Sequence, residues 1–93
     1  MRRKLSSREA DRIRRDGLDL TDRHLQLRVL ARLDLHKVRK IFLEGEMYQV
    51  GSHKYRSALQ LGEATAFVVF ERVFDNNVLK TVGVTRSKRS RWD

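Results

Sequence analysis

The spacing of apolar residues changes near Gly45 and divides the chain into two parts. Before Gly45, apolar residues recur three and four positions apart, which is the spacing of one helix face. After Gly45, they alternate with polar residues, which is typical of half-buried strands. The pattern therefore predicts an α+β fold in which the helices precede the strands.

Capping residues predict where the first helix begins. Ser6 with Glu9 three residues later forms a capping-box sequence, which predicts a helix over residues 7–16. The apolar side of this helix is thin, because only Ala10 and Ile13 would be buried. We therefore expect it to pack weakly or to require a partner.

Two further helices are predicted over residues 21–33 and 34–44. Thr21 or Asp22 can cap the first of them, and Asp34 can cap the second. The second carries an apolar stripe that we expect to reach the core, made of Leu35, Val38, Ile41 and Phe42.

Four strands are predicted after Gly45, namely residues 46–50, 54–61, 64–74 and 78–85. The turn between the last two is predicted at Asp75-Asn76-Asn77, because Asn tolerates a positive φ. The third strand is apolar on both faces, so we expect it to be central, with Val69 in the core. Short connections make neighbouring strands antiparallel. The sequence therefore predicts N-terminal helices packed on a four-stranded antiparallel sheet, in the order α-α-α-β-β-β-β.

Charge suggests the kind of partner. The 93 residues hold 21 Lys and Arg against 12 Asp and Glu, a formal net charge of +9. Much of the excess lies at the two ends, which divides the chain into a basic N-terminal arm (1–21), one α+β domain (22–86) and a basic tail (87–93). Such a balance favours a polyanion, and nucleic acid is the first expectation. The chain has no cysteine and no apolar run of membrane-spanning length, so a cytoplasmic protein with no membrane partner is expected.

One helix carries a narrow cationic strip. His24, Arg28 and Arg32 recur every fourth residue in 21–33, and the rest of that helix is largely apolar. Like charges at this spacing repel one another, whereas a solvated strip usually mixes signs. The strip is either the solvent face of a buried helix or a site for an anion.

With this strip, the order of later motifs resembles the RelE superfamily, above all the BrnT-like toxins and related cytosolic domains. The motifs are Glu44-Gly45-Glu46, Lys54-Tyr55-Arg56 and a closing Val82-Gly83-Val84-Thr85-Arg86. The resemblance implies helices on a twisted antiparallel sheet. It also implies endoribonuclease activity on messenger RNA and neutralisation by a cognate antitoxin, which we expect to be acidic.

RNA cleavage without a metal or other cofactor requires an acid or base and cations that stabilise the transition state. His24 is the natural acid or base, because imidazole titrates near neutral pH. Arg28, Arg32 and Arg86 complete the candidate catalytic set as phosphate clamps. Three histidines without cysteine or a repeated carboxylate spacing do not form a metal motif.

A second group of cations is expected to bind nucleic acid without taking part in catalysis. Alternation places Tyr55 toward the core and its neighbours on the opposite face of the sheet. The group comprises Arg8, Arg12 and Arg15 of the first helix, Lys54 and Arg56 of the second strand, and Lys88, Arg89 and Arg91 of the tail. Two alternatives to an enzyme stay open: a non-catalytic nucleic-acid-binding protein, and a protein that docks an antitoxin.

Charges at Glu71 and Arg72 interrupt the most apolar strand. A charge in a central strand is costly unless it is paired or solvated. The two side chains should reach opposite faces of the sheet, and structural ion pairs are one explanation for them.

The catalytic hypothesis makes one direct prediction. His24→Ala should lower the rate of RNA cleavage by about 10²–10⁴-fold and change RNA affinity little, because a positioned acid or base acts in the transition state. Single-turnover cleavage of single-stranded and ribosome-bound RNA measures the first quantity, and equilibrium binding measures the second. A drop of several degrees in melting temperature would instead identify His24 as a packing residue.

Overall fold

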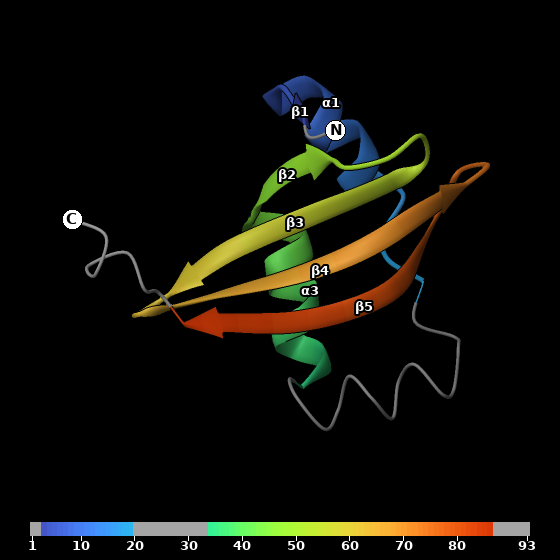
Figure 1. Cartoon of the computed structure of the whole chain (residues 1–93). Helices are drawn as coiled ribbons and strands as arrows, with labels where there is room; N and C mark the ends of the chain where they lie inside the picture. The colour runs from blue at the N-terminus through green and yellow to red at the C-terminus, as the bar shows by residue number, and fades with distance from the viewer. Residues whose placement is uncertain (1–2, 20–33, 87–93) are drawn as a thin grey trace.

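The computed structural model describes residues 3–19 and 34–86 (Figure 1). Its elements, in chain order, are β1 (Arg3–Lys4), α1 (Ser7–Arg15), α3 (Leu35–Glu44), β2 (Glu46–Gln49), β3 (Lys54–Leu61), β4 (Ala64–Val73) and β5 (Asn76–Arg86). The expected α+β fold is confirmed, whereas the predicted helix over 21–33 lies outside the described residues. Neither of the two described helices is long and apolar enough to cross a membrane.

The strands form one antiparallel sheet in the order β1-β2-β3-β4-β5 (Figure 1). Four of them match the predicted strands, but the sheet has five, so the predicted number was wrong. The additional strand is β1, in which Arg3 lies opposite Gln49 and Lys4 lies opposite Tyr48. A strand of two residues is too short to show alternating polar and apolar positions in the sequence. Only its pairing with β2 defines it as a strand.

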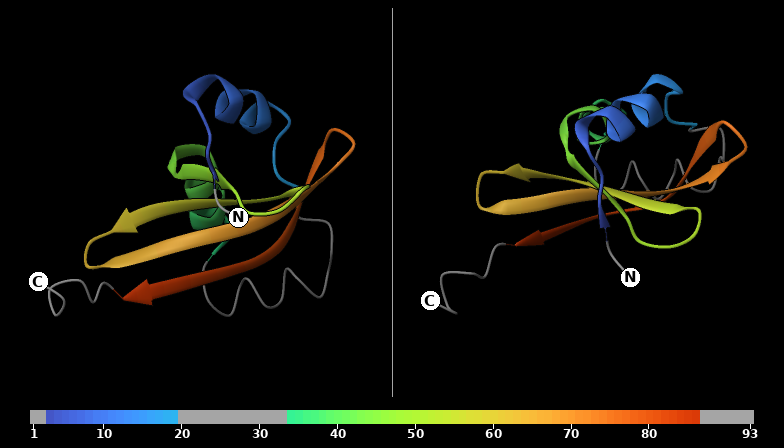
Figure 2. Two further views of the ribbon diagram at one scale, coloured as in Figure 1. Left: turned by 45° about the horizontal axis from the view of Figure 1, so that its top comes forward. Right: turned by 90° about the horizontal axis from the view of Figure 1, so that it is seen from above.

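Both described helices pack on the same side of the sheet (Figure 2), which we call the helix side. The Phe42 ring of α3 meets the Phe70 ring of β4 edge-on, with centroids 5.2 Å apart. The buried hydroxyl of Ser57 donates to the carbonyl oxygen of Ile41 at 2.7 Å and so satisfies one of the unpaired carbonyls at the helix end. A Cβ at Gly45 would lie 2.6 Å from that same oxygen, so only glycine permits this close approach.

Helix α1 begins at the predicted capping box, in which the Ser6 hydroxyl accepts from the Glu9 amide and the Glu9 carboxylate accepts from the Ser6 amide. It buries Ala10 and Ile13, as the sequence predicts. With Leu5, these residues join the main core, so the segment expected to be an arm contributes to the domain interior.

The end of α1 is attached to the sheet by a buried amide. The Asn77 side chain is only 1% exposed, and its Nδ2 donates to the carbonyl oxygens of Ile13 at 2.9 Å and Gly17 at 2.7 Å. Its Oδ1 accepts from Arg72 Nη1 at 2.7 Å, and Arg72 Nη2 lies 2.9 Å from the Asp16 carboxylate. The Asn77 amide therefore provides partners for the end of a helix and for a partly buried guanidinium.

The charges in β4 are both paired. Arg72 reaches the helix side and contacts Asp16, and Glu71 faces the other way and lies 3.5 Å from Lys80. The explanation by structural ion pairs is therefore confirmed. The opposite directions follow from the alternation of side chains along a strand.

The turn between β4 and β5 does not lie where the sequence predicts. Phe74 and Asp75 form it, and Phe74 takes the positive φ of 60°, while Asn76 and Asn77 already belong to β5. A positive φ at the first of two central residues is the pattern of type II′ turns, which favour Gly there. The buried hydrogen bonds of Asn77 fix the register and displace the turn from the residues that would form it best.

The opposite face of the sheet, which we call the outer face, has neither α1 nor α3 over it (Figure 2). Along β4, Ala66, Val68 and Phe70 are buried on the helix side, whereas Val69 on the outer face is only half-buried. The expectation that Val69 lies in the core is therefore wrong. Its apolar neighbours on the outer face have another role, described below.

The two faces of β4 should tolerate charge differently. Val68→Asp should lower the free energy of unfolding by more than about 3 kcal/mol, because it buries an unpaired carboxylate. Val69→Asp should lower it by under about 2 kcal/mol, because water reaches the outer face. Urea unfolding of both variants measures the difference, and equal losses would contradict the assignment of faces.

The strained turn should also be measurable. Phe74→Gly should raise the free energy of unfolding by about 0.5–1 kcal/mol, since relief of the left-handed strain exceeds the extra chain entropy of glycine. Phe74→Ala keeps a Cβ and serves as the control in the same urea titration. A destabilised glycine variant would show that the Phe74 ring packs against the fold.

Candidate nucleic-acid interface

Strand β3 carries predicted binding residues on the outer face. Arg56 lies opposite Val69 of β4 and Lys54 lies opposite Glu71, while Tyr55 between them faces the core. The Tyr55 ring stacks on Phe70 with centroids 5.7 Å apart, which confirms its structural role. Alternation along one strand thus brings Lys54 and Arg56 together on an accessible surface, as predicted.

Arg56 stacks on an aromatic ring. Its guanidinium carbon lies 4.4 Å from the centroid of Phe67, over the ring, which is cation–π geometry. The far end of the ring lies over Gly83 of β5, where a Cβ would lie 2.4 Å from the Phe67 Cζ. Gly83 therefore leaves room for the ring to lie across the sheet, where Phe67 presents a half-buried π surface.

A second aromatic residue borders Arg56 from the other side. Tyr48 of β2 lies directly opposite Arg56, and Lys4 of β1 lies opposite Tyr48. The Tyr48 hydroxyl donates to Glu46 Oε1 at 3.4 Å, and Lys4 Nζ lies 3.0 Å from Glu46 Oε2. The hydrogen bond and charge of Lys4 lower the pKa of the Glu46 carboxyl. One row across three strands is therefore Lys4, Tyr48 and Arg56.

The cations of the outer face differ in whether they are neutralised. Lys4 and Lys80 each have a carboxylate partner, in Glu46 and Glu71 respectively. The Arg56 side chain makes no hydrogen bond or ion pair with another described residue, and its buried Nε has no partner among them. Lys54, two residues along the same strand face, is exposed and likewise unpaired within the described ranges. Of the two, Arg56 combines an unpaired charge with an aromatic ring, and Lys54 adds a second exposed cation on the same strand face.

The predicted row on α1 lies on the other side of the molecule. Arg8, Arg12 and Arg15 are all exposed, and none of them pairs with a carboxylate among residues 3–19 and 34–86. Because α1 packs on the helix side, these arginines do not share a surface with Arg56 (Figure 2). The structure thus divides the predicted binding residues between two faces.

Most of the candidate catalytic residues lie outside the part of the chain that the structure describes. His24, Arg28 and Arg32 lie outside the described residues, as do Lys88, Arg89 and Arg91 of the tail. The backbone of Arg86 ends β5 opposite Ala64, at the end of the sheet far from the β4–β5 turn. The structure therefore places only the backbone of Arg86 from this set.

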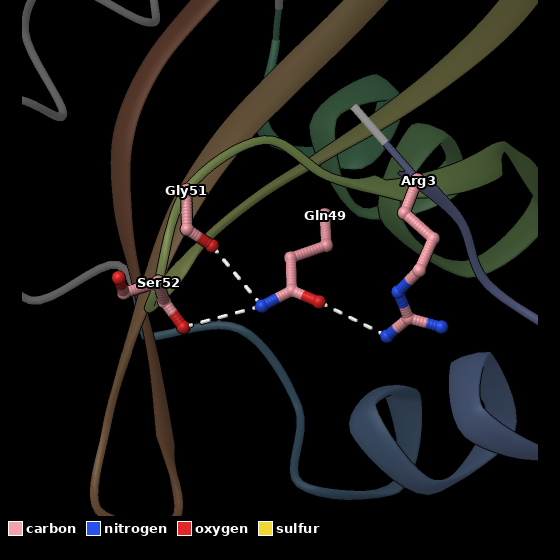
Figure 3. A pocket seen from close by; sticks show the side chains of 4 residues that line it. All are labelled: Arg3, Gln49, Gly51 and Ser52. Carbon is pink, nitrogen blue, oxygen red and sulfur yellow. Dashed lines mark hydrogen bonds between the residues drawn. The ribbon is translucent and has the colours of Figure 1, made fainter. Parts of the chain in front are cut away.

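A hollow of about 440 Å³ near the N-terminus is lined by residues that hydrogen-bond to one another (Figure 3). The Gln49 amide donates to the carbonyl oxygens of Gly51 at 3.1 Å and Ser52 at 3.3 Å, and it accepts from Arg3 at 3.0 Å. Arg3 also pairs with Glu9 at 3.2 Å. These hydrogen bonds connect β1 to the end of β2 and to the β2–β3 loop.

No cluster of three or more His, Asp or Glu side chains in the described part of the chain could hold a metal ion. Comparison with known proteins finds no matching family model, no curated protein and no solved structure.

Sequence reasoning found the cations of this surface and missed the aromatic residues. Tyr48 and Phe67 lie on strands predicted correctly, but their approach to Arg56 depends on the register between strands. Alternation in 46–50, with Met47 inward, already placed Tyr48 outward. That signal could have indicated an aromatic residue beside the cationic strand face.

Proposed function

We propose that this protein binds single-stranded RNA on the outer face of its sheet. The observation that carries the proposal is the Arg56 guanidinium stacked over Phe67 at 4.4 Å, without a carboxylate partner among the described residues. A cation and a ring held together in this way can stack on an unpaired base and attract its phosphate. Tyr48, opposite Arg56, adds a second ring on the adjoining strand.

The aromatic rings on this surface favour single-stranded RNA over a duplex. Aromatic rings reach base faces only where the bases are unpaired and unstacked from each other, which is how single-stranded RNA is usually recognised. Lys54 stands next to Arg56 along β3 and supplies a phosphate contact. The exposed arginines of α1, on the helix side, add long-range attraction.

The RelE-like and BrnT-like resemblance adds cleavage of the bound RNA and an acidic antitoxin to this proposal. Both additions stay predictions, because His24, Arg28 and Arg32 lie outside the described residues. Binding at the outer face does not depend on either of them.

Two arginines on opposite faces allow a matched test. Arg56→Ala should weaken the binding of a labelled single-stranded RNA by roughly tenfold or more, because it removes both stacking and charge. Arg12→Ala removes the same charge from the helix side and should weaken binding by about twofold or less. Fluorescence anisotropy measures both affinities, with melting temperatures as the check on folding.

A third variant separates stacking from charge. Phe67→Leu keeps an apolar cover over Gly83 but removes the π surface, so RNA affinity should fall while the slope of affinity against salt stays unchanged. Equal losses from Arg56→Ala and Arg12→Ala, with Phe67→Leu binding normally, would show that charge alone drives binding and would contradict the proposal.

A further inference from the structure

The tip of the β4–β5 hairpin presents an aromatic ring to solvent. Phe74 is 94% exposed, and its neighbour Val73 is 43% exposed. The ring stands at a backbone position with φ 60°, where glycine would be unstrained. A large apolar side chain in this place gives the fold neither burial nor favourable local geometry. Strain kept at an exposed position suggests that the ring itself is used.

Phe74 forms one wall of a hollow at the hairpin end of the sheet. The hollow has a volume of about 550 Å³ and is lined by His53, Tyr55, Glu71, Arg72, Val73 and Phe74. Its lining combines ring surfaces with groups able to donate or accept hydrogen bonds. A flat heterocycle with polar edges matches such a lining better than a purely apolar side chain does.

The hollow borders the proposed RNA surface at Glu71, whereas Tyr55 and Arg72 in its lining belong to the helix side. Lys54 lies opposite Glu71 of the hollow and two residues along the same strand face from Arg56. Phe74 follows Phe67 by seven residues along the chain, a separation of about 23 Å at strand spacing. A stacked single strand covers that distance with about seven nucleotides, and an extended strand with fewer.

We propose that Phe74 is a second base-stacking residue, which receives a base of the same RNA strand at the hairpin tip. This inference rests on the proposed function. The contact is to the base and not to the phosphate, because the exposed carboxylate of Asp75 beside the ring repels phosphate. Lys54 then holds the backbone between the two stacking positions, which fixes the direction of the strand along β3 and β4.

A tryptophan at position 74 reports this contact directly. The chain has one tryptophan, Trp92, so Phe74→Trp in a Trp92→Phe background gives a single emitter at the hairpin tip. Titration with an oligouridylate of about twelve nucleotides should quench its fluorescence. The midpoint of the quenching curve should equal the midpoint of the binding curve measured by anisotropy. The matched control is Leu43→Trp in the same background, which places the emitter on α3 at a residue 52% exposed. Its emission should not change.

Affinity provides the second measurement. Phe74→Ala should weaken binding of the oligonucleotide of about twelve nucleotides by roughly 5- to 150-fold, the usual effect of one stacked base. It should leave binding of one of about three nucleotides unchanged, because that cannot reach from Phe67 to Phe74. The change removes no charge, so the salt dependence should stay the same. Phe74→Tyr keeps a ring and should restore affinity.

The outcomes separate this inference from the proposed function. If wild type binds the longer oligonucleotide but Phe74→Ala binds it equally well, or the emission of the Phe74→Trp variant does not respond, the stacking role of Phe74 is overturned. That result would assign the exposed ring to a protein partner. If wild type binds no RNA of either length, the proposed function itself fails, and the inference fails with it.

Discussion

The buried amide of Asn77 is the contact on which the arrangement of the whole described chain depends. It accepts a hydrogen bond from Arg72 and donates two to the end of the N-terminal helix, so it joins residues about 60 positions apart in sequence. Alanine there would remove all three hydrogen bonds, and a buried polar group that loses its partner costs about 1–3 kcal/mol. Because the amide has one geometry that serves all three groups, it also fixes the register of the β4–β5 hairpin. The turn at the tip follows from that register.

The two faces of the sheet differ in what covers them. On the helix side, apolar side chains of β4 meet α3, and the hydroxyl of Ser57 and the absent side chain of Gly45 let the helix end approach the sheet closely. On the outer face, Phe67 and Val69 have no such layer over them and are covered in part by long polar side chains. Arg56 lies on Phe67 as an aliphatic stem and a flat cation. A surface of this kind is stable in water and still offers a π face to a ligand.

Much of this fold could be predicted from the sequence, because local signals and tertiary demands agree over most of the chain. The capping box at Ser6 and the cap at Asp34 placed two helices, and alternation placed four strands with Lys54 and Arg56 outward. The failures lie where distant contacts decide. Strand β1 exists only through its pairing with β2. The side chain of Asn77 bonds to the end of α1, so the turn forms at Phe74 instead of at Asn77. The aromatic residues of the candidate site, Tyr48 and Phe67, were missed for the same reason, since no single segment of sequence determines the register between strands.

The order in which these contacts can form has a consequence for synthesis on the ribosome. The meander from α3 to β5 is made of neighbours in sequence, so its loops are short and close quickly. Helix α1, by contrast, is made before the sheet but meets its partner Asn77 only after that residue, 64 positions beyond Ile13, has been made. Until then its thin apolar side must wait in solvent, where a short helix is marginal on its own. Folding should therefore end with α1 packing on a preformed sheet, although α1 is synthesised before that sheet.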